Sequence, residues 1–337
     1  MRLGRRVAEQ LKFSNSDGLH DLPAIADYWS RTHLVPIFEA FGYRDQTDFM
    51  VRQLLAMDVA APRILSIGSG DGSHDLRIAG ALVAAGCSDF SYELVDSNPG
   101  LLASARAHAE AAGLAGQLRF TCSPVEALPT GSRYDAVIAI QFLHHVVALE
   151  TLFEQIRGWL VPGGRFLVDD MIGRNGHMRW PEAEAEIRRL WSTLDARYKY
   201  HHLHQVVNHE FVNWDCSLTG FEGIRAQDIV PALLQAFHFD HFIAFGNLID
   251  VFIDRPYGPN FDPGDPRDRA FIDAVHTLDE ELLRSGALTP THLVAALVTE
   301  APATIHLRAG ITPAACLRTS AARETPSASR LRGPARS

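Results

Sequence analysis

Three glycines alternate with small polar residues directly after a short apolar run, in the segment ILSIGSGDG (64–72). Glycine has no Cβ and readily takes positive φ, so such a turn lets a ligand approach the backbone at the carboxyl end of a strand. A dinucleotide-binding GxGxxG motif counted from Gly68 would need glycine at Ser73, whereas the spacing here is GxGxG. The spacing therefore favours a cofactor without a pyrophosphate over a dinucleotide. A plain structural turn without a ligand is the alternative interpretation.

An acidic side chain closes the next apolar run, SYELVDSNP, at Asp96. A carboxylate at the end of this second strand can accept hydrogen bonds from both hydroxyls of a ribose. The alternative interpretation is a solvent-exposed aspartate that only ends the strand. Together with the glycine turn, Asp96 predicts a ribose-binding position.

Two histidines, His144 and His145, follow the run YDAVIAIQFL, which we expect to be the fourth strand. Imidazole has an ordinary pKa of about 6.5, so it can accept a proton at neutral pH. Open α/β sheets bind ligands at the carboxyl ends of their strands, where this pair falls. The pair is a candidate for proton transfer, and a packing or cofactor-supporting role is the alternative.

A second histidine group, HHLHQVVNHE, begins at His201. Its spacing is neither HExxH nor another established zinc-ligand pattern, so we expect no metal site. Two interpretations of His201 stay open: it contacts a bound substrate, or it lies in the core or at the end of a helix. Trp214, in the following NWD string, is a weaker candidate for acceptor contact.

Tyr28, Trp29 and His33 lie within about one and a half turns of an expected N-terminal helix. They could form a wall of an acceptor pocket, or they could be core aromatics at helical spacing. Pro36 interrupts the apolar stripe of this helix, since proline lacks the backbone N–H that a helix needs.

Between Pro62 and Asp170, short β-branched runs alternate with Ala-rich segments of helical pattern. This alternation is typical of βαβ units and predicts a doubly wound α/β fold with a parallel sheet. We expect five parts: a helical N-terminal extension or lid (1–62), a cofactor-binding core (63–170), a helical insertion that caps the acceptor (171–238), the C-terminal part of the sheet with an inserted helix (239–307), and a disordered basic tail (308–337).

With these motifs in this order, the chain resembles the class I S-adenosylmethionine-dependent methyltransferases of bacteria. The resemblance rests on ILSIGSGDG, Asp96, YDAVIAIQFLHHV and LVPGGRFLV (160–168). It implies a Rossmann-like sheet of seven strands whose last strand, Leu293–Val298, is antiparallel, and S-adenosyl-L-methionine as the cofactor. The cofactor-binding residues that it implies are Gly68, Ser69, Gly70, Asp71, Gly72, Asp96, Ser97, Ser123, Val125 and Gln141. Many members of the family carry acids where this chain has Ser66 and Pro124.

Composition limits the partners and the location. The chain of 337 residues has 31 basic and 40 acidic side chains, a formal charge of −9. Residues 308–337 hold six arginines and one acid, so the rest of the chain carries −9 − 5 = −14. Such a body repels a phosphate backbone, which argues against nucleic acid as a partner. No apolar run is long enough to span a bilayer, and Arg2, Arg5 and Arg6 precede a polar stretch, so we expect a cytoplasmic protein without membrane contact.

The prediction from sequence is thus a methyltransferase that acts on an oxygen or nitrogen atom of a small-molecule metabolite by direct displacement. A general base is needed only if the acceptor enters in its protonated form. Two alternatives stay open: an inactive S-adenosylmethionine-binding protein, and a NAD-dependent oxidoreductase, which Ser73 disfavours. The oligomeric state is also open, a homodimer included.

Overall fold

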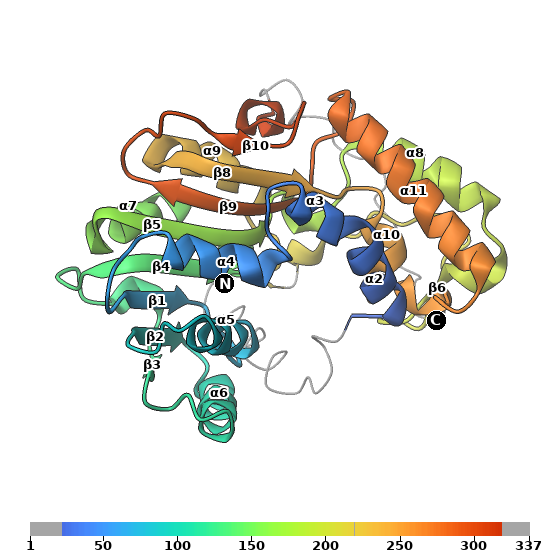
Figure 1. Cartoon of the computed structure of the whole chain (residues 1–337). Coiled ribbons are helices and arrows are strands. Elements are labelled where there is room, and N and C mark those ends of the chain that lie inside the picture. The colour runs from blue at the N-terminus through green and yellow to red at the C-terminus, as the bar shows by residue number, and fades with distance from the viewer. Residues whose placement is uncertain (1–21, 219, 319–337) are drawn as a thin grey trace, which may run out of the picture.

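A central sheet of eight strands organises the computed structural model, which describes residues 22–218 and 220–318 (Figure 1). The strand order is β3-β2-β1-β4-β5-β9-β8-β10. The strands are β1 (Arg63–Ile67), β2 (Ser91–Asp96), β3 (Leu118–Cys122), β4 (Tyr134–Ile140), β5 (Leu160–Met171), β8 (His238–Phe245), β9 (His292–Val298) and β10 (His306–Leu307).

The strand directions confirm the predicted fold class. β1 pairs in parallel with β2 and β4, and β4 pairs in parallel with β5. β9 is antiparallel to both of its neighbours, β5 and β8. The central strands are buried on both faces, which explains their nearly continuous apolar runs. The two-residue strand β10, which pairs in parallel with β8, adds an eighth strand to the seven predicted.

Helices cover both faces of the sheet. In Figure 1, α4 (Gln46–Leu55) and α5 (Ser73–Ala84) lie in front of the sheet, and α7 (Leu149–Trp159) and α9 (Ile229–Ala236) lie behind it. α6 (Pro99–Ala111) packs beside β2 and β3. Over the described ranges, no helix has both the length and the apolar character to cross a bilayer. The 3₁₀ helices are η2 (Val125–Ala127), η3 (Leu143–His145), η4 (Asn175–His177), η5 (Ala196–Lys199), η6 (Cys216–Leu218), η7 (Ala226–Asp228), η8 (Gly258–Asn260) and η9 (Pro313–Cys316).

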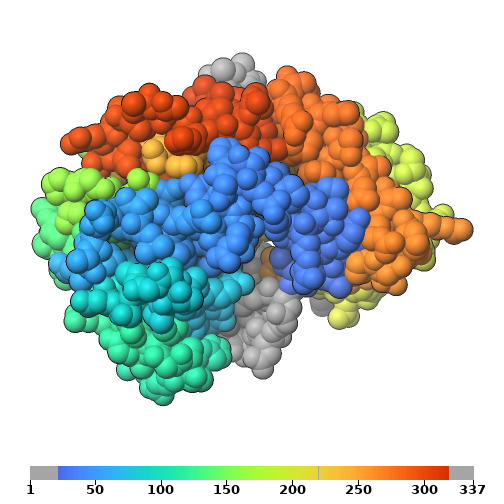
Figure 2. Space-filling model, viewed as in Figure 1, coloured from blue at the N-terminus to red at the C-terminus, as the bar shows by residue number. Residues whose placement is uncertain are grey.

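A group of helices gathers beyond the carboxyl ends of the parallel strands, and we call it the helical cap (Figure 1). It consists of α2 (Ala24–Trp29), α8 (Pro181–Thr193), α10 (Asp250–Ile253) and α11 (Pro266–Arg284). A short hairpin of β6 (Tyr200–His201) and β7 (Val206–Val207) lies with it. Figure 2 shows the N-terminal segment, in blue, as a band that reaches from the sheet to the orange α11.

The N-terminal helix is continuous but changes its winding before the proline. α2 runs into the π-helical segment η1 (Ser30–Leu34) and then into α3 (Val35–Glu39). Because Pro36 has no N–H to donate into the preceding turn, a wider turn accommodates it without ending the helix. The predicted interruption is therefore a local widening rather than a break.

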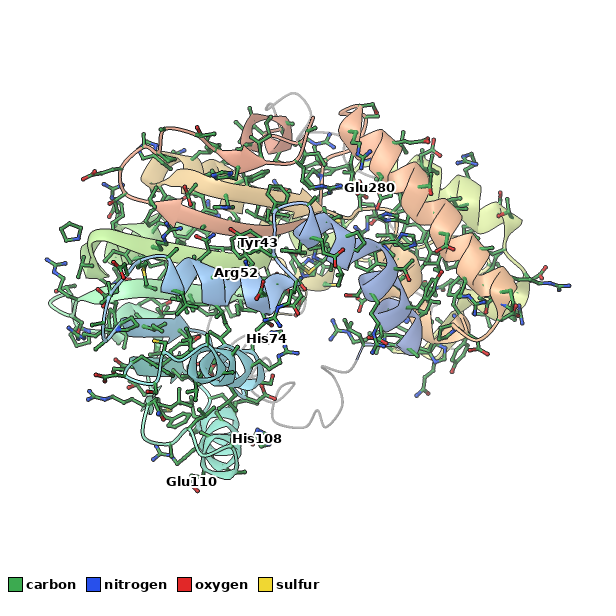
Figure 3. All side chains as sticks on the ribbon, viewed as in Figure 1. Tyr43, Arg52, His74, His108, Glu110 and Glu280 are labelled. Atoms are coloured by element: carbon green, nitrogen blue, oxygen red, sulfur yellow. The ribbon has the colours of Figure 1, made fainter. Side chains whose placement is uncertain are left out.

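The C-terminal boundary differs from the prediction. Residues 308–318, expected to be part of a disordered tail, are packed on the fold, and Ile311 is only 1% exposed. Arg308 forms an ion pair with Glu280, which Figure 3 labels on α11. The prediction is wrong for these residues, because buried Ile311 and the ion pairs of Arg308 with Glu280 and of Arg318 with Glu182 hold the segment on the fold. Residues 1–21, with the helix expected at RRVAEQLKF, and residues 319–337 lie outside the described residues.

Candidate functional site

The three glycines of the turn after β1 all have positive φ, but their missing side chains face different surroundings. A Cβ on Gly68 would lie 2.0 Å from Cδ2 of Phe142, and a Cβ on Gly72 would lie 3.0 Å from Cβ of Ala105. A Cβ on Gly70 would meet nothing within 4 Å. Gly68 and Gly72 are therefore required by packing, and Gly70 leaves the middle of the turn open to a ligand.

Asp96 faces this turn. Its Oδ2 accepts a hydrogen bond of 3.0 Å from the Gly70 N–H, and its Oδ1 accepts one of 2.7 Å from the Asn98 N–H. Burial raises the pKa of Asp96, although these backbone donors oppose the shift. The Oγ of Ser69 is buried and has no hydrogen-bond partner in the described part of the chain. A buried hydroxyl and a carboxylate beside an open glycine turn fit a ligand that carries a ribose and other polar groups.

The remaining residues of the predicted cofactor site surround Asp96 and the turn. The Ser123 N–H donates to the Asp96 carbonyl oxygen at 3.0 Å, and buried Val125 begins η2 two residues later. The Asp71 carboxylate accepts from both N–H and Oγ–H of Ser73 and so orders the first turn of α5. Ser97 is exposed directly after Asp96. His74, next to Ser73, lies at the same end of α5 in Figure 3.

A carboxylate that the sequence analysis missed lies where β4 and β5 end. Gln141 has a φ of +50°, which is unusual for a residue with a side chain. Its N–H donates to the Asp169 carbonyl oxygen at 2.8 Å, and its Nε2 lies 3.4 Å from the Asp169 Oδ1. Burial raises the pKa of Asp169 to about 6. The available signal was the pair of aspartates in VDD, at the carboxyl end of the fifth predicted strand. Open α/β sheets bind their ligands at this end of the strands.

The predicted histidine pair divides into a buried and a more open member. The His144 ring is 3% exposed, and its Nδ1 lies 2.6 Å from Oδ1 of Asp170. Burial opposes protonation, but the Asp170 carboxylate raises the pKa of His144 to about 10. The His145 ring centroid lies 4.1 Å from that of His144, and the charge of His145 lowers the pKa of Asp96. His145 therefore lies toward Asp96, whereas His144 is held inside the fold.

Two further side chains from the insertion reach His144. The Oε1 of Glu222 lies 3.4 Å from Nε2 of His144 and 3.0 Å from Nε2 of His177. Neither residue was predicted, because each belongs to a segment without a familiar motif, RNGHM and GFEG. The signal was weak: a histidine and a glutamate, each next to glycine.

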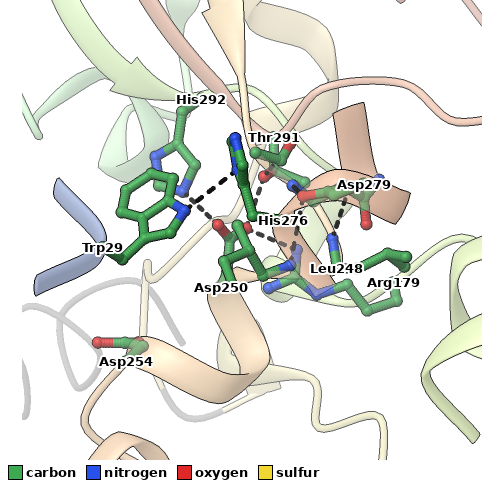
Figure 4. A network of polar contacts seen from close by, with 12 residues as sticks. Trp29, Arg179, Leu248, Asp250, Asp254, His276, Asp279, Thr291 and His292 are labelled. Carbon is green, nitrogen blue, oxygen red and sulfur yellow. Dashed lines mark hydrogen bonds and ion pairs between the residues drawn. The ribbon is translucent and has the colours of Figure 1, made fainter. Parts of the chain in front are cut away.

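A buried polar network connects the cap to the edge of the sheet (Figure 4). The Asp250 carboxylate is bound by Arg179 at 2.9 Å, by Thr291 at 2.6 Å and by His292 at 3.2 Å. Burial alone would raise the pKa of Asp250, but the charges of His292 and Arg179 hold it below its ordinary range. The indole of Trp29, at the end of α2, lies beside this network near His292 and His276 (Figure 4). The N-terminal helix thus reaches the start of β9.

The predicted acceptor residues fall into two groups. Trp29 donates to Nδ1 of His276 at 3.3 Å, and Tyr28 and His33 both bind Asp273, so this group attaches α2 and η1 to α11. The other group is at the hairpin and contains His201 and Trp214. The His201 ring stacks on His204 at 4.2 Å, and the Trp214 ring lies 4.5 Å from His204. His201 is buried in β6, whereas Trp214 is partly exposed.

Residues 64–164 match a family model described as a methyltransferase domain. The match covers less than a third of the chain, from β1 to the first residues of β5, and includes the glycine turn, Asp96 and the histidine pair. The cap and the last strands lie outside it.

Among solved structures, the chain is similar to geranyl diphosphate C-methyltransferase from Streptomyces coelicolor A3(2), with 11% identity over 75% of this chain and 79% of that one, at a TM-score of 0.41. It is also similar to YjhP from E. coli, with 14% identity over 76% of this chain and 92% of that one, at a TM-score of 0.42. A protein assigned to the S-adenosyl-L-methionine-dependent methyltransferases, from Methanococcus maripaludis, shares 21% identity over 44% of this chain at a TM-score of 0.32, and the chain spans about three fifths (62%) of its length. Likenesses this weak add nothing to the family match.

Proposed function

We propose that this protein, whose residues 64–164 are a class I S-adenosylmethionine-dependent methyltransferase domain, methylates an oxygen or nitrogen atom of a small-molecule acceptor. One observation carries the proposal: the proton-accepting carboxylate of Asp169 lies at the carboxyl ends of β4 and β5, held by Gln141 and close to the charge of His292. An acceptor hydroxyl or ammonium group must lose a proton, and a base at this edge of the sheet suits that need.

The glycine turn and the side chains around it would hold the cofactor. Asp96 has the position and the hydrogen-bonding capacity to bind ribose hydroxyls, and the orphan Oγ of Ser69 can bond to a polar group in the open space beside Gly70. Ser123 and Val125 border the same space on the β3 side. When bound, S-adenosyl-L-methionine supplies a methyl group on a positively charged sulfur and leaves as the neutral thioether.

We assign proton removal to Asp169. As the acceptor oxygen or nitrogen forms its bond to the methyl carbon and the carbon–sulfur bond breaks, the acceptor proton moves to the Asp169 carboxylate. A pKa of about 6 leaves this group ionised at neutral pH yet makes it a stronger base than an ordinary aspartate. Asp169 is half-buried and Gln141 is exposed, so the carboxylate remains within reach of an acceptor.

The helical cap would bind the acceptor. Trp29, the His201 group and the network at Asp250 come from segments outside the matched domain, so acceptor choice would depend on residues beyond that domain. The formal charge of −14 on residues 1–307 favours a small metabolite over a nucleic acid.

The test uses the full chain, methyl-labelled S-adenosylmethionine and a bacterial metabolite extract, with mass spectrometry to identify labelled products. We expect a labelled small molecule, and we expect Asp169→Asn to lower the rate about 100-fold while cofactor affinity stays within about threefold. The wild-type rate should rise with pH through about 6 and then level off, because the base must be ionised. Asp89→Asn, an exposed change at the amino end of β2, is the matched control.

Three results would contradict the proposal. No binding of the cofactor in calorimetry would remove the methyltransferase site altogether. Binding without any product from any extract would favour an inactive binding protein. Full activity in Asp169→Asn would remove the assigned base.

A further inference from the structure

We infer that His144, His177 and Glu222 form a binding site for one divalent transition-metal ion beside the cofactor site. Each residue offers one ligand atom, and the three atoms lie within 4.8 Å of one another. They come from η3 after β4, from η4 and from the loop before η7, so only the folded chain brings them together.

The distances suit a common metal ion. Metal–ligand bonds of about 2.0–2.2 Å place neighbouring ligand atoms about 3.0–3.5 Å apart in tetrahedral or octahedral geometry. The Glu222 Oε1 lies 3.4 Å from Nε2 of His144 and 3.0 Å from Nε2 of His177. Two imidazoles and one carboxylate are the protein ligands of many zinc and non-haem iron sites, and they leave positions open for an oxygen ligand.

His144 is oriented as metal-bound histidines are. Its Nδ1 is hydrogen-bonded to Asp170, which leaves Nε2 directed at Glu222. Asp170 is itself fixed, because its Oδ2 accepts from the N–H groups of Phe142 and Leu143. A buried carboxylate behind a histidine sets the tautomer and the ring orientation of a ligand, and such partners are typical of metal sites.

The backbone around His177 is arranged for the same purpose. Gly176 and His177 have φ of +68° and +55°, and the left-handed region is unfavourable for histidine. The Gly176 N–H donates to the Gly223 carbonyl oxygen at 2.8 Å. A Cβ on Gly223 would lie 2.9 Å from the backbone N of His177, so only glycine allows the two loops to approach this closely. The strained turn and the close approach place the His177 ring opposite Glu222.

The metal would deepen the proposed function, and this step rests on it. A dication with an open coordination position lowers the pKa of a bound hydroxyl, so it would bind an acceptor through oxygen and make that oxygen a better nucleophile. The proton would still move to Asp169, and the methyl group would still arrive from the cofactor. The histidines of the β6–β7 hairpin, whose spacing predicted no metal site, take no part in this cluster.

The test is metal binding by the intact chain after treatment with a chelator. Calorimetry with Zn²⁺ and with Mn²⁺ should show one equivalent bound, and Co²⁺ should give an absorption spectrum typical of histidine and carboxylate ligands. Glu222→Gln, which keeps the shape of the side chain, and His177→Ala should each weaken binding at least 100-fold. Asp170→Asn should weaken it about 10-fold to 100-fold, as loss of a partner behind a ligand does.

His202→Ala and His209→Ala are the matched controls, since both remove a histidine outside the cluster. The inference would be overturned if none of the three ions bound at ion concentrations up to 100 times that of the protein. It would also be overturned if Glu222→Gln bound the metal with unchanged affinity. The wild-type Co²⁺ spectrum decides even if a variant does not fold. None of these measurements uses the cofactor or an acceptor, so their failure leaves the proposed methyl transfer intact, and failure of cofactor binding leaves the metal site intact.

Discussion

Replacing Gly68 by alanine places a methyl group within the ring of Phe142. The added Cβ would lie 2.0 Å from Cδ2 and 2.4 Å from Cγ, far inside any real carbon contact, so the ring or the turn must move. The φ of +66° adds a backbone cost of about 1–2 kcal/mol for any residue with a Cβ. Gly70, at φ +57°, pays the same backbone cost but has no neighbour within 4 Å.

The two substitutions therefore separate the steric effect from the backbone effect. Forcing an extra methyl into a packed region costs about 1–3 kcal/mol. We expect Gly68→Ala to lower the free energy of unfolding by about 2–5 kcal/mol and Gly70→Ala by about 1–2 kcal/mol, since only the first adds the overlap. Urea unfolding, with the slope m compared across variants, measures both values.

A double-mutant cycle identifies Phe142 as the cause. Phe142→Ala removes the ring, so the loss caused by Gly68→Ala should shrink by at least about 1 kcal/mol in that background. Cofactor affinity should give the opposite order, because Gly70 borders the open space: Gly70→Ala should weaken binding at least tenfold although it destabilises the fold less than Gly68→Ala does. Equal destabilisation by the two alanines, with no coupling to Phe142, would show that the ring does not lie on the turn.

Three further predictions concern buried charges. Burial raises the pKa of Asp75 from 3.8 to about 6, so the wild-type free energy of unfolding should fall by about 3 kcal/mol as the pH rises from about 4 to about 6. Asp75→Asn should abolish this fall in urea unfolding. Parallel curves of unfolding free energy against pH for the two proteins would refute the prediction. Asp96→Asn should weaken cofactor binding about 10-fold to 100-fold, as loss of charged hydrogen bonds does, and an unchanged Kd in calorimetry would remove Asp96 from the site. Arg179→Met leaves the buried charge of Asp250 to His292 and Thr291 and should lower the free energy of unfolding by about 1–3 kcal/mol. Arg188→Met, on the exposed face of α8, should lower it by about 0.5 kcal/mol or less. Equal losses in the two variants would contradict this reasoning.

The sequence predicted what short stretches of chain determine by themselves. A strand that runs into the glycine turn and an acid at the end of β2 follow from local patterns of apolar and small residues, whereas the antiparallel strand β9 was implied by the family resemblance. Asp96 could be placed beside the turn because the carboxyl ends of adjacent parallel strands meet at one edge of a sheet. The closeness of Asp96 to the glycine turn was therefore predictable without a structure.

The surroundings of the histidine pair were not accessible in this way. His144 meets Asp170, 26 positions away, and Glu222, 78 positions away, and a regular spacing predicts neither contact. The same holds for the aromatic residues of α2: the pattern suggested a wall or a core, and the structure gives Tyr28 and His33 a common partner, Asp273, about 240 residues later. Contacts between an insertion and the core depend on loop conformations that periodicity does not encode.

The substitution at Ser66 shows how such a distant contact can replace a motif residue. Many members of the family that the sequence resembles carry an acid at this position of β1, where this chain has Ser66. In the fold, α5 turns the Asp75 carboxylate into the sheet, where Tyr92 and Ser66 both hydrogen-bond to it. A buried carboxylate is thus present under the glycine turn, supplied by the helix rather than by the strand. A position-by-position comparison with the motif counts Ser66 as a lost acid. It does so although a carboxylate, that of Asp75, lies beside Ser66 in the folded chain.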